Sequence, residues 1–335
     1  MERTQERMIR QLTKILEMET AELGAYLSGK LFEVYGKDLI YTTEDYIYAK
    51  GEIPVALIAH MDTVHNVPAV EIMTEGILTS STGLGADDRA GVYAILHLLD
   101  LGYRPSVIFL NYEESGGIGA TAFVKRMKKD KRQLGVNFMV EFDRKNANDA
   151  VYYSCDNPEF ETFINSFGFK TAWGSFSDIS IIAPWAKIAA VNLSVGYYFQ
   201  HTRHEILVLA DLVNTLKKAE KILQTDTKPF VYMEVQSGWE YYYEKKPSKK
   251  SGKKSAKKTP IQLWRDDMLH SVEGKEMLDS YADEHGEEYA QLLVDDDETL
   301  HMWQDEVDRS DEDIIKQLKE AGDLTEEDWK LYHGI

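Results

Sequence analysis

Two short apolar runs, each followed by side chains that bind metals, constrain the fold of this chain more than any other feature. Residues 55–58 (VALI) lead to His60 and Asp62, and residues 107–110 (VIFL) lead to the pair Glu113–Glu114. Continuous apolar runs of this length are typical of strands buried on both faces of a parallel sheet. In open α/β sheets, ligand sites form at the carboxyl ends of the strands. The sequence therefore predicts two strands that deliver histidine and carboxylate groups to one edge of a sheet.

Apolar strands and helical stripes alternate along residues 1–225, and this alternation predicts an α/β fold with a mostly parallel central sheet in a three-layer sandwich. An amphipathic helix is expected over residues 3–27, and a pair of short strands within residues 31–50. Further strands are expected at 137–142, 152–155, 179–182 and 188–195, and helices at 88–101, 121–134, 160–167 and 205–223.

The composition changes sharply towards the C-terminus, which divides the chain into three predicted parts. Residues 1–243 form a catalytic domain, whose last strand is expected to contain Trp239 and Tyr241–Tyr243. Residues 244–259 hold eight lysines with Ser, Gly and Pro, which is typical of a flexible linker. Residues 260–335 hold 24 acidic against 6 basic side chains, a net −18, with enough apolar residues for short helices.

Charge and cysteine content exclude several classes of protein. The net charge of −19 makes nucleic acid a poor partner, and Cys155, the single cysteine, excludes a disulfide framework. The charged N-terminus lacks the apolar region of a signal peptide, and no run approaches about 18 apolar residues, the length that spans a membrane. We therefore expect a cytoplasmic protein with no membrane partner.

Histidines and carboxylates at strand ends and turns are the candidate metal ligands and catalytic residues of this chain. They are His60, Asp62, Asp87, Glu113, Glu114, Asp143 and His201. Histidine with carboxylate ligands suits zinc or a related divalent ion. Asp62 can hold the tautomer of His60, and Asp87, in the Gly-rich turn GLGADDRAG, can bridge two ions. Of the adjacent glutamates, one can bind a metal while the other accepts a proton from water.

These motifs resemble the di-zinc exopeptidase superfamily, which includes zinc aminopeptidases, tetrahedral aminopeptidases and the acylase/carboxypeptidase group. The similar segments are HMD, ADDRAG, YEESGGIGA, EFD and QHTRHE, in that order within residues 1–225. The resemblance implies that His60, Asp87 and Asp143 hold one metal and that Asp87, Glu114 and His201 hold the other. It also implies Glu113 as general base, Asp62 as the residue that orients His60, and a cis peptide bond between Asp87 and Asp88.

The spacing of the motifs indicates a compact member of that superfamily. Only 26 residues separate His60 from Asp87, and 57 separate Asp143 from His201. Neither interval has room for the lid or dimerisation domain of the larger relatives. The resemblance is therefore strongest to the simple zinc aminopeptidases.

The sequence leaves three functions open. The first is an aminopeptidase that uses two divalent ions, zinc or alternatively cobalt or manganese, with Glu113 as base for a metal-activated water. The second is an amidohydrolase or deacylase that uses the same metals on an N-acyl substrate. The third is a non-catalytic protein that binds a basic partner through its acidic tail. A homo-oligomer is compatible with each of them.

Other polar residues have weaker predicted roles. The superfamily pattern of His followed four residues later by Glu selects His201 with Glu205 over His204. His65 is a weaker candidate ligand. The segment Ser175–Asp178 either lines the substrate cleft or caps the element that follows it. Cys155 is expected to be a small buried residue without catalytic function.

Overall fold

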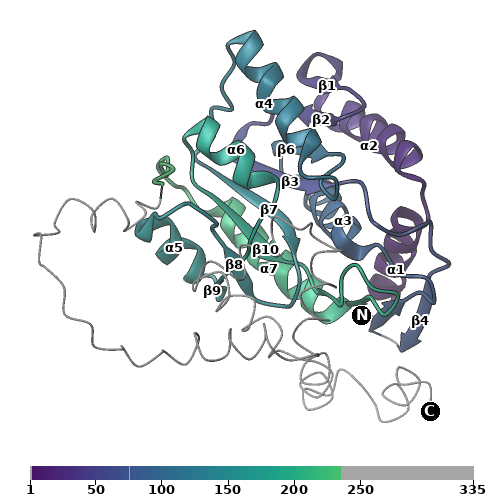
Figure 1. Cartoon of the computed structure of the whole chain (residues 1–335). Helices are drawn as coiled ribbons and strands as arrows, with labels where there is room; N and C mark the ends of the chain where they lie inside the picture. The colour runs from purple at the N-terminus through teal and green to yellow at the C-terminus, as the bar shows by residue number, and fades with distance from the viewer. Residues whose placement is uncertain (1, 75, 235–335) are drawn as a thin grey trace, which may run out of the picture. The chain divides into compact units, whose positions relative to one another are not determined.

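A mainly parallel sheet of eight strands organises the part of the chain that the computed structural model describes, residues 2–74 and 76–234 (Figure 1). The strand order is β1-β2-β6-β3-β7-β10-β8-β9. The strands are β1 (Ile40–Thr42), β2 (Tyr46–Ala49), β3 (Ile53–His60), β6 (Pro105–Leu110), β7 (Phe138–Arg144), β8 (Asp149–Val151), β9 (Lys170–Ala172) and β10 (Ala190–Ser194). β3 pairs in parallel with both β6 and β7, and β7 pairs in parallel with β10, so the centre of the sheet is parallel. This confirms the predicted sheet.

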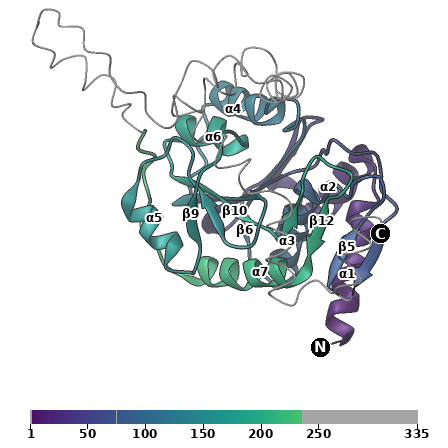
Figure 2. The ribbon, with the colours of Figure 1, turned by 60° about the horizontal axis from the view of Figure 1, so that its bottom comes forward.

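Helices cover both faces of this sheet, because its central strands are apolar on both sides. The helices are α1 (Glu2–Leu16), α2 (Thr20–Tyr35), α3 (Ala86–Asp100), α4 (Ile118–Asp130), α5 (Pro158–Asn165), α6 (Asp178–Ala186) and α7 (Leu209–Gln224). Along β3, Leu57 belongs to the core shared with α1, α2, α3, α5 and α7, and Ile58 belongs to the core shared with α4 and α6. Figure 2 shows α4 and α6 on one side of the sheet and α7 on the other. The three-layer sandwich is therefore confirmed.

A second, antiparallel sheet contains a segment that was predicted to be helical. Its order is β11-β12-β5-β4, with β11 (Tyr197–Tyr198), β12 (Ile206–Val208), β5 (Ile77–Thr79) and β4 (Glu71–Thr74). The prediction of a helix from residue 205 was wrong at its start, because residues 206–208 are all buried and pair with β5. The helix begins at Leu209 instead.

The single helix predicted over residues 3–27 is two helices, and a distant arginine explains the break. α1 ends at Leu16 and α2 begins at Thr20. The guanidinium of Arg89 donates to the carbonyl oxygens of Ile15 (2.9 Å) and Met18 (2.6 Å). The last carbonyls of a helix have no partner within it, so Arg89 stabilises the end of α1 at this point.

The strand predicted at residues 179–182 is also wrong, since these residues lie in α6. Ser177 is the N-cap residue of α6, and its backbone N–H donates to the Ser180 hydroxyl at 3.2 Å. A short apolar run cannot be assigned to strand or helix from periodicity alone. Of the two roles predicted for Ser175–Asp178, the capping role is therefore confirmed for Ser177.

The predictions for the linker (244–259), the acidic region (260–335) and the aromatic cluster at 239–243 lie outside the described residues. Within the described residues, none of the helices combines the length and the apolar character needed to cross a membrane.

Candidate metal centre

Three neighbouring parallel strands bring the predicted ligands to one edge of the sheet. His60 is the last residue of β3 and pairs with Leu110, the last residue of β6, from which the chain turns towards Glu113 and Glu114. On the other side of β3, Ile58 pairs with Glu141 of β7, so His60 and Asp143 each lie two residues beyond paired positions. The parallel register therefore places these groups together, as predicted.

The bridging candidate Asp87 comes from a separate element, the N-terminus of α3. Gly85 precedes it with φ +69°, a left-handed conformation that favours glycine. Asp87 itself has φ −78° and ψ 103°, outside the helical region, and its peptide bond to Asp88 is cis, as the resemblance implied. At this non-helical position before the regular part of α3, the Asp87 side chain points towards His60 and His201.

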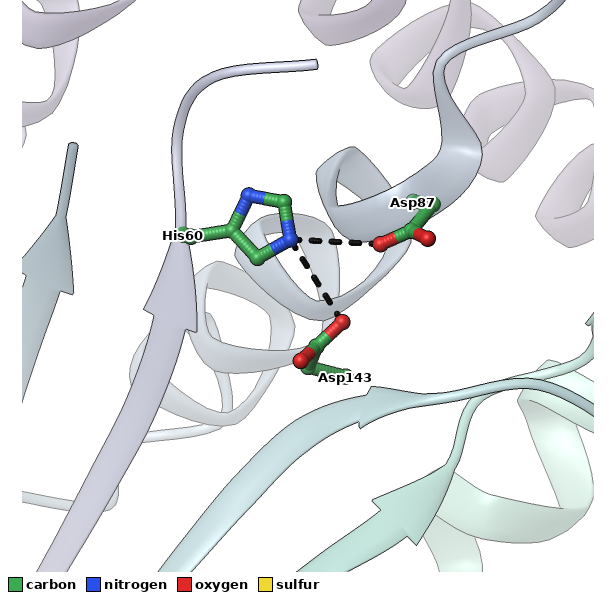
Figure 3. Close-up of side chains that lie close together, drawn as sticks. All are labelled: His60, Asp87 and Asp143. Carbon is green, nitrogen blue, oxygen red and sulfur yellow. Dashed lines mark hydrogen bonds and ion pairs between the residues drawn. The ribbon is translucent and has the colours of Figure 1, made fainter. Parts of the chain in front are cut away.

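His60 contacts two carboxylates with the same ring nitrogen (Figure 3). Its Nε2 lies 3.2 Å from Oδ1 of Asp87 and 3.5 Å from Oδ1 of Asp143. All three side chains are at least nine-tenths buried, and their ligand atoms lie within 4.8 Å of one another. This is the first predicted ligand set.

The second ligand set shares Asp87 with the first. Nε2 of His201 lies 3.3 Å from Oδ2 of Asp87 and 3.1 Å from Oε2 of Glu114. Asp87 therefore faces His60 with one carboxylate oxygen and His201 with the other. This is the arrangement required of a carboxylate that bridges two ions.

Asp62 contacts more of the site than the resemblance implied. His60 Nδ1 lies 3.0 Å from the Asp62 carbonyl oxygen and 3.5 Å from its carboxylate Oδ1. The Asp62 carboxylate also accepts the backbone N–H groups of Glu113 (3.1 Å) and Glu114 (3.2 Å). Asp62 thus holds the histidine ring mainly through its backbone carbonyl oxygen, which leaves Nε2 of His60 to bind a metal ion, and its carboxylate holds the turn that carries both glutamates.

The electrostatics of the metal-free site fit a place for cations. Burial raises the pKa of Asp143 to about 6, and the nearby Asp87 carboxylate adds to this. Burial alone would lower the pKa of His201, but its hydrogen bonds to Asp87 and Glu114 raise that pKa to about 11. Protons thus offset the buried negative charge where cations would otherwise do so. Carboxylate oxygens and imidazole nitrogens are ligand types that divalent metal ions bind, and Asp87 belongs to two such groups.

Glu113 and Glu114 both lie close to His60. Their ligand atoms and those of His60 form a third group within 4.8 Å. Burial raises the pKa of Glu113 to about 9, with Asp143 and Asp178 adding to this and His60 opposing it. With this pKa, the Glu113 carboxyl group holds a proton at neutral pH when no cation is bound beside it.

Several buried polar groups lie behind the ligands, and of these only Ser177 and Asp178 had a role predicted from the sequence. The Ser177 hydroxyl contacts Glu141 and lies 3.0 Å from Oδ2 of Asp143, and Tyr197 donates to Oδ1 of Asp143 at 3.2 Å. Asp178 is fully buried, and neither of its carboxylate oxygens has a hydrogen-bond partner. Burial raises the pKa of Asp178 to about 8. In the sequence, only the polar residues of the segment Ser175–Asp178 indicated such groups.

The residues with weaker predicted roles lie outside the ligand groups. His201, not His204, belongs to a ligand group, and the His204 ring lies 3.2 Å from Nε of Arg203. His65 belongs to none of the ligand groups found in the described chain. Cys155 is buried, as expected.

No protein-family model matches the sequence, and no curated protein matches it. Several solved structures match the fold of this chain. The aminopeptidase PepT from Bacillus cereus is 16% identical with a TM-score of 0.50, over 66% of this chain and 98% of that one. A tripeptidase from Staphylococcus aureus is 16% identical (TM-score 0.51; 66% and 99%), and an aminopeptidase from Desulfurococcus kamchatkensis is 14% identical (TM-score 0.52; 67% and 96%). At these identities the likeness establishes the fold, and the fold that the resemblance to the di-zinc exopeptidases implied is thereby confirmed.

Proposed function

We propose that this chain is a two-metal hydrolase that removes N-terminal residues from peptides. The observation that carries the proposal is the position of Asp87, with one oxygen 3.2 Å from His60 and the other 3.3 Å from His201. Asp143 completes the first ligand set and Glu114 the second. The folds of PepT and the tripeptidase, which are peptidases, agree with this proposal.

Zinc is the metal that the donor set favours, with cobalt or manganese as alternatives. Two such ions, when bound, would supply Lewis acidity and lower the pKa of an attacking water. The protein contributes the base. Glu113 accepts the proton of the water and returns it to the leaving amine, because it lies close to His60 and belongs to neither of the ligand groups that contain Asp87.

The aminopeptidase is better supported than the deacylase by the proteins whose folds this chain shares. PepT from Bacillus cereus and the protein from Desulfurococcus kamchatkensis are both described as aminopeptidases. An aminopeptidase acts on a substrate with a free amino group, whereas a deacylase acts on an N-acyl group, so the two functions differ in the substrate end that they require.

A substrate panel with defined metals tests the proposal. The protein is depleted of metal, reconstituted with zinc, cobalt or manganese, and assayed on aminoacyl anilides, dipeptides, tripeptides and N-acyl amino acids. We expect about two ions per chain and hydrolysis only of substrates with a free amino group. A folded protein that binds no ion after reconstitution would refute the metal site. Exclusive cleavage of N-acyl substrates would assign the same site to a deacylase.

A further inference from the structure

Glu205 is fully buried beside the metal centre without being one of its ligands. Its exposure is 0%, and it lies four residues after His201. Oε2 accepts the backbone N–H of Gly85 at 2.6 Å, and Oε1 accepts the backbone N–H of Asp87 at 2.9 Å. Both oxygens of the Glu205 carboxylate are thus hydrogen-bonded to the backbone of the turn Gly85–Asp87, which ends in the bridging candidate Asp87.

The turn at Gly85–Asp87 needs an external acceptor. The first N–H groups of a helix have no partner within the helix. Gly85 occupies the N-cap position of α3 but has no side chain that can accept them, and the Asp87 carboxylate faces the two histidines. Asp87 is also non-helical, so regular helix hydrogen bonds do not fix its conformation. A carboxylate at a helix N-terminus is favourable in charge as well as in geometry.

Glu205 is itself held by the elements around it. It immediately precedes β12, which pairs with β5, and the Thr79 hydroxyl of β5 donates to the Glu205 carbonyl oxygen at 3.4 Å. On its other side, Nε2 of His65 lies 3.4 Å from Oε2 of Glu205. The loop that supplies the ligand His201 therefore also supplies a rigid support for the turn that carries Asp87.

We infer that Glu205 is a positioning residue for both metal ions, acting through the backbone of the Asp87 turn. The inference rests on the proposed two-metal site. Because Asp87 is shared, displacement of its turn weakens both ions together. Loss of Glu114, in contrast, removes a ligand of one ion only. Groups that orient metal ligands typically change metal affinity by about 10- to 100-fold.

The test compares metal affinity in Glu205→Gln, Glu205→Asp and Glu114→Gln with that of the wild-type full chain. Zinc binding is measured by competition with a chromophoric chelator, which does not depend on catalysis. Glutamine keeps the length but has only one acceptor oxygen. Aspartate keeps the charge and both oxygens but is shorter by one methylene, so it cannot reach both N–H groups. We expect both Glu205 variants to weaken both ions by at least about 10-fold, whereas Glu114→Gln weakens one.

Each other outcome overturns the inference or one of its parts. A folded Glu205→Gln variant with two wild-type affinities shows that Glu205 does not position the site. Wild-type affinities in Glu205→Asp show that its charge acts at long range and that the two hydrogen bonds do not matter. A variant that is unfolded without metal is titrated with zinc, and the concentration that restores its circular dichroism reports the affinity. A wild-type chain that binds no zinc refutes the proposed function instead of the role of Glu205.

Discussion

Replacing Glu113 by glutamine separates the roles of two adjacent and chemically identical residues. Glu113 and Glu114 both place a carboxylate oxygen within 4.8 Å of His60, and both have their backbone N–H groups bonded to Asp62. Distance alone therefore leaves both within reach of a metal ion. The contact of Glu114 with His201 at 3.1 Å places it with the second ligand set, and Glu113 is therefore the residue proposed as the base.

The expected effect follows from the environment of Glu113. Its carboxylate lies within 4.8 Å of the ligand atom of His60, and it belongs to neither of the ligand groups that contain Asp87. Glutamine keeps the size of the side chain but cannot accept a proton. A general base contributes roughly 10²- to 10⁴-fold to turnover. At about 1.36 kcal/mol per tenfold change, the barrier should rise by about 2.7 to 5.4 kcal/mol.

The assay is steady-state hydrolysis of an aminoacyl anilide, with metal content measured on the same samples by mass spectrometry. Glu113→Gln should keep two ions and an unchanged KM, and lose at least about 100-fold in kcat. The matched control is Glu114→Gln, which should lose one ion and regain some activity in excess metal. Near-normal turnover of Glu113→Gln, or loss of an ion from it alone, would show that the two roles are reversed.

Three further predictions follow from the site and from the domain division. Removal of metal by a chelator should lower the melting temperature and re-addition should restore it, because an ion present at 100 times its Kd stabilises the native state by about 2.7 kcal/mol; an unchanged melting temperature would argue against native-state ions. In the metal-free protein, burial raises the pKa of Glu113 to about 9 and that of Asp178 to about 8, above their unfolded values. The folded state therefore binds these protons more tightly than the unfolded state. Their contribution to stability is complete below about pH 4 and is lost as the pH rises through 8 to 9. Urea unfolding at pH 6 and 9 should therefore show lower stability at pH 9 for the wild type and a smaller difference for Asp178→Asn. Deletion of residues 244–335 should leave a folded chain that hydrolyses small substrates, and a folded but inactive product would show that the tail belongs to the catalytic unit.

The sequence predicted those parts of the site that local pattern determines. Apolar runs before His60 and Asp143 mark buried strands, and strand ends in a parallel sheet meet at one edge. Asp87 was recognisable because glycines flank it in a turn. These residues lie far apart in the chain, yet each has a local signal that does not depend on the others.

The parts that were missed depend on tertiary contacts. The break between α1 and α2 is stabilised by Arg89, about 70 residues away, so the apolar spacing of residues 3–27 does not reveal it. Strand β12 forms because β5 lies beside it. The helix at Asp178–Ala186 did have a local signal, the serine pair Ser177 and Ser180 at capping-box spacing, which outweighs its short apolar run. The sequence identified Glu205 only as part of the His201 motif and gave no signal for its role, because its partners are backbone N–H groups of a distant turn.

The contacts of Arg89 also determine which kind of genetic experiment can detect the contribution of the first helix. Nε of Arg89 donates to the carbonyl oxygen of Met61, between His60 and Asp62, while Nη1 donates to carbonyl oxygens of α1 and of the bend after it. These acceptors are backbone atoms, so substitutions at Ile15 or Met18 leave them in place. Deletion of the segment instead removes every acceptor of the terminal nitrogens of Arg89 and leaves only the bond from Nε to Met61. Substitutions in the first helix therefore report the loss of its buried apolar side chains, whereas stepwise deletion also reports the loss of the backbone acceptors of Arg89.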